Sequence, residues 1–453
     1  MTSVRRKHLC VCIKKSRVSL ILGGECRIIT AWGLRMEDKV RYRLIAQVNQ
    51  AFTPGAPIDS RDLFAGRKRE VEKLISTVFQ RGQHAVLFGE RGVGKTSLAN
   101  TLFDFLVLMG EFKYQRARIN CAEGMDFESI WRLIFRQLST KIDGEDVELD
   151  NTLPGNPNSE NVREVFQAMD DPSIVIIDEL DRINTTATQT ALADTVKTLS
   201  DNSINTTLIM VGVADSLDQL IAEHRSIERA IKQIPMPRMS KSELIEIVNK
   251  GLSHCPELAI DPSVRDRIAD YSQGLPSYTH LLSREAALNV ARHHRTYVIM
   301  PDLEYAIKEA VDSQLETTLT AYNNAVSSPR GTNYKPVLLS CALAPKDEHG
   351  YFYAKNVTEP LRLITAKNYK IPAFARHLKD FCDSSRGPIL ERRGKPKRVR
   401  YRFVKPLMEP YVILRGLADG LITEDRLSHP SAASTEPEQL SLLSPSSVPP
   451  IEI

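Results

Sequence analysis

The sequence lacks long apolar runs and paired cysteines, and each absence argues against a class of protein. No apolar stretch approaches the ~18 residues that a membrane-spanning helix needs. The seven cysteines are scattered without a CxxC pair, which argues against a disulfide framework and against a zinc site. We therefore expect a chain without membrane segments that works in the reducing cytoplasm.

Charge is distributed unevenly along the 453 residues, a length that suits two or three domains. Residues 1–35 hold eight basic side chains and one acidic one, and residues 330–426 hold twenty basic and ten acidic ones. The segment between them is acidic, so the net charge of +4 conceals a division. An acidic body joined to a basic C-terminal module indicates two different tasks.

The most specific motif lies in HAVLFGERGVGKTSLAN, residues 84–100. A strand-sized apolar run precedes the glycines and a helically spaced pattern follows them, which is the context that gives GxxxxGK[ST] its meaning. Backbone N–H groups of such a P-loop turn toward nucleotide phosphates, and the following helix adds its positive end. We expect Lys95 to reach the β and γ phosphates and Thr96 to hold Mg²⁺. ATP should be contacted by Gly89, Glu90, Arg91, Gly92, Val93, Gly94, Lys95, Thr96 and Ser97.

A second apolar run, SIVII, ends in Asp178 and Glu179. Ligands of parallel α/β sheets bind at the carboxyl ends of the strands, where these two carboxylates are expected to lie. The pattern predicts that Asp178 coordinates Mg²⁺ and that Glu179 orients or deprotonates the attacking water. A solvated acidic turn is the alternative interpretation.

A third apolar run ends in Asp215, and Arg225 and Arg229 follow on one face of a short predicted helix. Many related ATPases keep an arginine at this place that reaches into a neighbouring subunit, worth roughly 10³ to 10⁵ in rate. Ordinary surface arginines paired with Glu223 and Glu228 remain the alternative.

The remaining chain divides into three parts. Residues 240–328 predict successive helices, with Ser240, Asp261 and Ser277 as N-caps, that would close over the nucleotide as a lid. Residues 335–426 predict helix, strand, two helices and a hairpin, the order of a winged helix. Residues 427–453 are rich in serine and proline and are predicted to be disordered.

The hairpin of the basic module alternates in its second strand. Arg398, Arg400 and Arg402 are expected on one face, while Val399, Tyr401 and Phe403 face the other way. Arginines gathered on one face repel one another, so attraction to a polyanion explains this face better than packing does. We therefore expect double-stranded DNA as a partner. Arg376 and Lys379 are placed on a helix that could enter the major groove. A winged helix that contacts protein instead is the alternative.

Residues 52–330 resemble the AAA+ ATPases of the origin-recognition (Orc1-like) type. The resemblance is carried by DLFAGRKREVEKL, GERGVGKT, IIDELD, GVADSL and SIERAIKQIPMPRMSKSEL, in that order. It implies a P-loop AAA+ core over 36–239, Arg229 as the arginine that acts on a neighbour, and Asp215 at the sensor-1 position. Residues 1–35 then read as a basic extension or a misassigned start before Met36.

Two positions depart from that family. Asp215 stands where members often carry an asparagine that donates a hydrogen bond, and Ser277 stands at the usual sensor-2 arginine. The segment QGLPSYTHLL looks more like signalling (STAND) ATPases. Both departures favour slow turnover or a nucleotide switch.

The sequence thus predicts an α/β P-loop NTPase with a helical lid and a winged helix. Its first interpretation is an ATPase, working as a homo-oligomer or with a related ATPase subunit, whose nucleotide state controls assembly on DNA. The other is a STAND-type switch whose C-terminal module contacts protein.

Overall fold

The computed structural model describes residues 38–110, 113–142, 145–213, 227–313, 316–328, 333–347, 349–395 and 398–423, and the backbone of three short strands before them. These strands, β1 Val11–Lys14, β2 Arg17–Leu22 and β3 Glu25–Thr30, form an antiparallel sheet within the predicted N-terminal extension. None of the helices in these ranges is long and apolar enough to span a bilayer.

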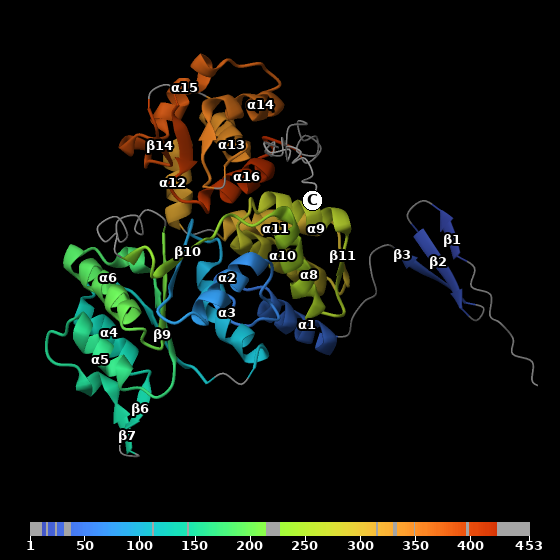
Figure 1. Ribbon diagram of the computed structural model, residues 1–453. Helices are drawn as coiled ribbons and strands as arrows, with labels where there is room; N and C mark the ends of the chain where they lie inside the picture. The colour runs from blue at the N-terminus through green and yellow to red at the C-terminus, as the bar shows by residue number, and fades with distance from the viewer. Residues whose placement is uncertain are drawn as a thin grey trace, which may run out of the picture.

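A five-stranded parallel sheet forms the centre of what we call the sheet unit, residues 58–239 (Figure 1). Its strand order is β10-β4-β9-β8-β5. The strands are β4 His84–Phe88, β5 Gln115–Asn120, β8 Ser173–Asp178, β9 Thr206–Gly212 and β10 Ile231–Pro235. Every residue of β8 and β9 is buried, as expected for strands covered on both faces.

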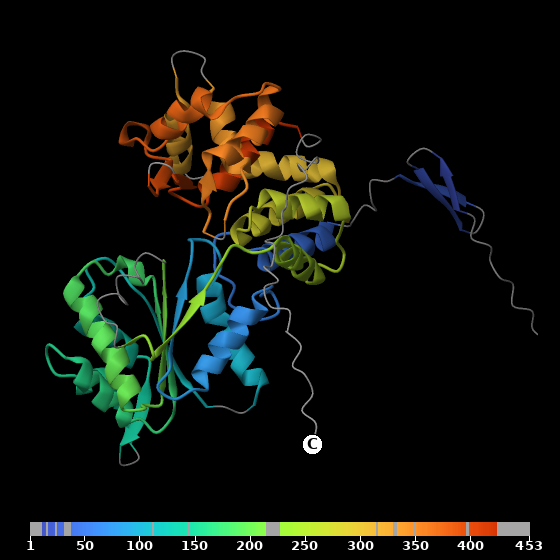
Figure 2. The ribbon, with the colours of Figure 1, turned by 45° about the horizontal axis from the view of Figure 1, so that its top comes forward.

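Helices cover both faces of this sheet (Figure 2). On one face lie α2 Lys68–Val78 and α3 Lys95–Leu108; on the other lie α4 Phe127–Phe135, α5 Ser159–Gln167 and α6 Thr186–Asp201. A hairpin and two short 3₁₀ turns complete the unit: β6 Ser139–Ile142, β7 Glu145–Glu148, η1 Leu149–Thr152 and η2 Leu180–Arg182. Val86 packs into one layer while Ala85 and Leu87 pack into the other, because successive strand residues point to opposite faces. This is the predicted P-loop NTPase fold.

The lid is helical. It contains α8 Lys241–Ser253, α9 Pro262–Tyr271, α10 Pro276–Arg292, α11 Met300–Asp312 and α12 Glu316–Val326, with the short strands β11 Ala259–Ile260 and β12 Tyr297–Val298. Ser240 and Asp261 cap their helices as predicted. Ser277 does not, because α10 already begins at Pro276, a residue whose fixed φ suits the first helical position.

The first described helix, α1 Asp38–Ala51, also belongs to the lid. Leu44, Val48 and Phe52 are fully buried in the same apolar cluster as the lid helices. The predicted domain boundary at residue 36 assigned this helix to the P-loop core, whereas it packs with the lid helices. Apolar spacing predicts a buried face but does not say which element covers it.

The C-terminal unit, residues 333–423, has the predicted order of elements up to the hairpin, and a last helix that was not predicted follows it. The elements are α13 Tyr334–Leu343, β13 Phe352–Tyr353, α14 Ala354–Thr365, α15 Ile371–Asp380, η4 Ser384–Arg386, β14 Leu390–Arg393, β15 Arg400–Phe403 and α16 Met408–Ala418. The three strands form an antiparallel sheet in the order β13-β15-β14. The last helix, α16, connects this unit to the lid.

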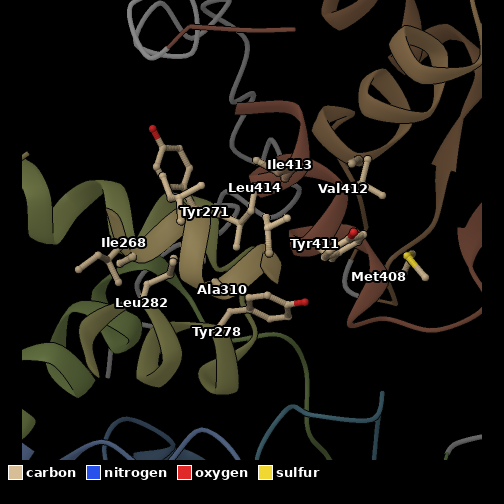
Figure 3. Packing of buried hydrophobic residues seen from close by; sticks show 14 of the residues in the cluster. Ile268, Tyr271, Tyr278, Leu282, Ala310, Met408, Tyr411, Val412, Ile413 and Leu414 are labelled. Carbon is tan, nitrogen blue, oxygen red and sulfur yellow. The ribbon is translucent and has the colours of Figure 1, made fainter. Parts of the chain in front are cut away.

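The contact between α16 and the lid is apolar, and we call it the apolar seam (Figure 3). Residues of α9, α10 and α11 meet residues of α16 in a single buried cluster. It includes Ile268, Tyr271, Tyr278, Leu282, Ala310, Met408, Tyr411, Val412, Ile413 and Leu414. Tyr322 of α12 also packs edge-to-face on Tyr411, with ring centroids 5.5 Å apart. The lid and the C-terminal unit therefore share one core, although the sequence suggested separate modules.

Candidate functional site

The loop between β4 and α3 is shaped by glycine. Gly89, Gly92 and Gly94 have φ of 156°, 89° and 94°, and the last two values lie where glycine is favoured. A Cβ on Gly89 would lie 2.3 Å from the carbonyl oxygen of Met236, so no side chain fits there. Gly94 is the N-cap of α3, which places Thr96 in the first turn with its free N–H groups.

Lys95 is held inside this loop. Its Nζ donates to the carbonyl oxygens of Gly89 and Glu90, at 3.0 and 2.8 Å. Burial lowers the pKa of Lys95 to about 8, against the opposing effect of Asp181 and Asp178. Lys95 therefore keeps its positive charge at neutral pH, close to where phosphates would lie.

The end of β8 supplies two carboxylates in different settings. The Asp178 side chain is buried, accepts from Arg118 Nη2 at 3.1 Å, and accepts the Glu179 N–H at 2.8 Å. Glu179 has φ 57° and ψ 39°, a left-handed backbone that costs a non-glycine residue roughly 1–3 kcal/mol and is typical of functional sites. Its carboxylate pairs with Arg182 Nε at 2.9 Å.

Thr96 and Asp178 line the same pocket and fit Mg²⁺. A hydroxyl and a carboxylate are hard oxygen donors, and Mg²⁺ commonly takes one or two protein oxygens together with phosphate and water. The described residues contain no group of three or more His, Cys, Asp and Glu side chains that could hold a metal without a phosphate. This donor set therefore suits a nucleotide-bound Mg²⁺ rather than a resident metal.

The pocket itself has a volume of about 310 Å³ and two chemically different ends, a size and shape typical of small-molecule sites. One end is charged and contains Lys95, Asp178 and Glu179. The other is formed by residues 53–58 together with the start of α10. Leu407 of the C-terminal unit also lines it, so three parts of the chain meet around one cavity.

A chain of four buried charges lies beside the P-loop, and we call it the ionic interface. Arg238 Nε lies 2.6 Å from Glu90 Oε2, and its Nη1 lies 2.9 Å from Glu409 Oε2. Lys346 Nζ lies 2.9 Å from Glu409 Oε1. The side-chain exposures of Glu90, Arg238, Glu409 and Lys346 are 7, 12, 0 and 7%. Two charges from the sheet unit thus pair with two from the C-terminal unit.

The pKa values of the two cations follow from this arrangement. Burial acts to lower the pKa of Arg238, but Glu409 and Glu90 outweigh it and raise that pKa. Burial lowers the pKa of Lys346, against the opposing effect of Glu409. Neighbouring packing tightens the contact, since the Leu407 side chain lies 3.2 Å from where a Cβ would stand on Gly92.

Some side chains of the residues predicted for the nucleotide site point elsewhere. The Glu90 side chain turns to Arg238 instead of the pocket, and Val93 is buried in the core of the sheet unit. Asp215 lies outside the described residues. Arg229 is 80% exposed and pairs with Asp201 at 3.0 Å. It precedes the amino end of β10, which lies beside the amino end of β4, whereas the P-loop follows the carboxyl end of β4. It therefore does not reach the nucleotide site of its own chain.

The predicted open arginine face is wrong for two of its three members. Arg402 pairs with Glu391 across the hairpin at 2.6 Å, and Arg400 lies 3.3 Å from Asp347. Both guanidinium groups also lie over the Tyr351 ring, at 4.7 and 4.6 Å from its centroid. Two carboxylates of the unit itself therefore neutralise this face.

The other three basic residues predicted to contact DNA lie on the surface. Arg376, Lys379 and Arg398 are exposed, and Arg376 approaches Asp380 only to 3.7 Å. Arg376 and Lys379 lie on α15, which Figure 1 shows on the side of the unit away from the sheet. These positions agree with the predicted exposed basic surface.

The sequence analysis did not identify Arg118, Arg238 and Glu409. Arg118 reaches Asp178 because β5 and β8 are neighbours in the sheet, a pairing that no local pattern reveals. Arg238 and Glu409 are 171 residues apart in the chain. His280 stood out only as part of the segment QGLPSYTHLL, one helical turn after Ser277, and no role was predicted for it.

Several solved structures are similar to this chain. The Walker-type ATPase PABY2304 of Pyrococcus abyssi is 15% identical over 79% of this chain and 98% of its own, with a TM-score of 0.49. The Aeropyrum pernix ORC2 protein, solved as ADPNP–ADP complexes, is 15% identical over 88% and 100%, with a TM-score of 0.47. The Aeropyrum pernix ORC1 protein, solved in complex with DNA, is 14% identical over 79% and 94%, with a TM-score of 0.44.

No curated protein sequence matches the chain. Residues 79–221 match the family described as AAA domain. The matched segment contains the P-loop, Asp178 and Glu179. It therefore covers the charged end of the pocket but neither the lid nor the C-terminal unit.

Proposed function

We propose that this protein binds ATP with Mg²⁺, hydrolyses it slowly, and uses the bound nucleotide to control its C-terminal unit on DNA. One observation carries the proposal: the P-loop, the lid and Leu407 of the C-terminal unit line a single pocket. A nucleotide in that pocket would contact all three, so its identity would bias their relative positions.

The chemical roles follow from the charged end of the pocket. Lys95 neutralises the phosphates, while Thr96 and Asp178 hold Mg²⁺, which supplies charge stabilisation for phosphoryl transfer. Glu179 orients the attacking water once it has left its ion pair with Arg182. That ion pair, together with Ser277 at the place of a sensor-2 arginine, is consistent with slow turnover.

The first test separates binding from chemistry. Lys95→Ala should abolish ATP binding, measured by titration calorimetry, because it removes the cation that is held inside the loop by the carbonyl oxygens of Gly89 and Glu90, where the β and γ phosphates would lie. Glu179→Gln should retain binding and lose at least tenfold in phosphate release, because the amide cannot accept the proton. Unchanged turnover in Glu179→Gln would remove that residue from its role.

Control of the C-terminal unit would run through Glu90. Its carbonyl oxygen accepts from Lys95, and its carboxylate pairs with Arg238 in the ionic interface. Phosphates compete for Lys95, which would free the Glu90 backbone and change how its carboxylate meets Arg238. ATP and ADP differ by the phosphate nearest Lys95, so they would hold the C-terminal unit with different strength.

The C-terminal unit would act as a winged helix on double-stranded DNA. Its α15 presents Arg376 and Lys379, and the hairpin presents Arg398. Such contacts are mainly to phosphate and make binding fall steeply with salt. Binding at 50 and 200 mM salt, with ATP, ADP or no nucleotide, tests this on the full chain, because α16 shares its core with the lid.

Arg376→Ala with Lys379→Ala should reduce the slope of affinity against salt by about two charges. Arg362→Ala is the matched control, since that exposed arginine pairs with Glu359 on the neighbouring helix α14. Equal slopes for the double variant and the wild type would remove α15 from the DNA surface.

Arg229 would complete the site of a second subunit, identical or related. It is exposed near the amino ends of β10 and β4, whereas the P-loop follows the carboxyl end of β4, so a nucleotide that it contacts would have to belong to a neighbour. Mixing Arg229→Ala protein with Glu179→Gln protein should then restore turnover, because some interfaces regain both groups. An absence of recovery would favour a structural role for Arg229.

A second candidate function is a signalling switch in which the C-terminal unit contacts protein. Two observations favour it: Arg400 and Arg402 are already neutralised, and the unit is seated on the P-loop through the ionic interface. If the full chain shows no salt-sensitive DNA affinity in any nucleotide state, this candidate replaces the first.

A further inference from the structure

His280 lies at the uncharged end of the nucleotide pocket and is not explained by packing alone. It occupies the second turn of α10, lines the pocket, and is only 6% exposed. Its Nδ1 is enclosed and has no hydrogen-bond partner among the described residues. A buried polar atom without a partner costs roughly 1–3 kcal/mol, so its retention calls for a reason.

The ring is held in a defined position. It packs edge-on against Phe52, with ring centroids 6.0 Å apart and planes at 67°. Phe52 is in turn fixed against α8, since a Cβ on Gly251 would lie 2.2 Å from its ring. Packing that holds a side chain in one position is what a recognition residue needs.

The lining of the pocket at this end suits the base of the bound nucleotide. Phosphates belong at the charged end beside Lys95, and residues 53–58 with Pro276 offer an uncharged, largely apolar wall at the other. The wall is tied to the P-loop helix, because the Ile58 N–H donates to Ser97 Oγ at 3.0 Å. A flat aromatic base with polar edges fits such a wall, and a single side-chain hydrogen bond would set its orientation.

We propose that His280 recognises the purine base of the bound nucleotide through Nε2, the ring nitrogen opposite the enclosed Nδ1. Burial lowers the pKa of His280 to about 4, so the imidazole is neutral at physiological pH. A proton on Nε2 leaves Nδ1 as an unpaired acceptor, which is tolerated better than an unpaired buried donor. The Nε2–H then donates to a ring nitrogen of the purine. This inference rests on the proposed nucleotide binding.

The experiment compares ATP with inorganic tripolyphosphate by titration calorimetry on the full chain. His280→Phe keeps a ring of similar shape against Phe52 and removes both nitrogens. It should weaken ATP about tenfold, the value of one hydrogen bond near 1.4 kcal/mol, and leave tripolyphosphate unchanged. His280→Gln keeps a donor and should recover part of the ATP affinity.

Thr279→Val is the matched control. Thr279 is the preceding residue of α10, is fully buried, and also has an Oγ1 without a partner among the described residues. It is not one of the residues that line the pocket, so its substitution should leave both affinities unchanged.

Three results would overturn the inference. One is an equal loss of ATP and tripolyphosphate affinity in His280→Phe, which indicates a structural role. Another is unchanged ATP affinity in both His280 variants. The third is equal affinity of the wild type for the two ligands, which means that no base is read. The proposed function survives all three if Lys95→Ala still abolishes binding, and it fails if the wild type binds neither ligand.

Discussion

The C-terminal unit contacts the rest of the chain through two interfaces that differ in chemistry, one apolar and one ionic. Toward the lid it presents the apolar seam, in which α16 packs among α9, α10 and α11 (Figure 3). Toward the sheet unit it presents the ionic interface, in which Glu409 and Lys346 meet Arg238 and Glu90. The first contact buries apolar and aromatic side chains, whereas the second depends on four charges.

This difference indicates which contact persists and which can open. Apolar burial is roughly proportional to area and tolerates small shifts. A buried ion pair is favourable only while its geometry is good, because each charge has lost its hydration. The lid and C-terminal unit are therefore expected to move together, and the ionic interface is expected to open when the P-loop changes.

The largest effect should come from removing the central carboxylate of the ionic interface. Glu409→Gln leaves Arg238 and Lys346 buried without their shared partner, which should cost about 3–5 kcal/mol of unfolding free energy. Urea unfolding measures this. Combining it with Lys346→Met should cost clearly less than the sum of the single changes; strict additivity would mean that the two charges do not interact.

The next largest loss of stability should come from a substitution in the apolar seam. Leu414→Ala removes a fully buried side chain of α16 and should cost about 2–5 kcal/mol, from lost transfer energy and the cavity that remains. Unlike the ionic interface, its cost should not depend on whether ATP or ADP is present. Val404→Ala, at an exposed position, is the control and should change stability by less than about 0.5 kcal/mol. A nucleotide-dependent cost for Leu414→Ala would contradict a permanent seam.

Acid should lower the stability of the protein through two buried histidines, one in the lid and one in the sheet unit. Burial lowers the pKa of His280 in the lid and of His84 in β4 to about 4, and His84 Nδ1 accepts the N–H of Leu208. The unfolded chain binds these protons from about pH 6.5 downward, before the folded chain does. The contribution of these two histidines to stability should therefore be constant above pH 6.5 and fall toward pH 4, by about 1.4 kcal/mol per unit for each histidine.

His280→Phe isolates the lid's share of that pH dependence. The variant should lose the part of the slope between pH 6 and 4.5 that His280 contributes in chemical unfolding, while His84 and His377, whose pKa values burial also lowers, keep theirs. A slope identical to that of the wild type would show that His280 is not protonated on unfolding in this range.

The smallest effect belongs to Arg229. Its ion pair with Asp201 is largely exposed, and such pairs contribute about 0–1 kcal/mol. Arg229→Ala should therefore leave the unfolding midpoint nearly unchanged while lowering turnover. A loss of several kcal/mol would assign this arginine to the fold of the sheet unit instead.

Local patterns were sufficient where the chemistry is local. The P-loop spacing places Lys95 and Thr96 correctly at the start of α3, and the apolar run of β8 ends at Asp178. Local patterns did not predict contacts between residues that lie far apart in the chain. The alternation of Arg400 and Arg402 predicts one shared face, but not that Asp347 and Glu391 would stand on it.

Local sequence patterns alone are enough to predict the phosphate-binding loop, the two carboxylates at the end of β8 and the order of elements in the C-terminal unit as far as the hairpin. Each of these depends on neighbours within a few residues, through backbone conformation and hydrophobic period. Only the tertiary structure decided that α16 joins the lid core, that Glu90 turns to Arg238, and that His280 lines the pocket. These contacts join residues far apart in the chain, and burial selects them by shape and charge in three dimensions.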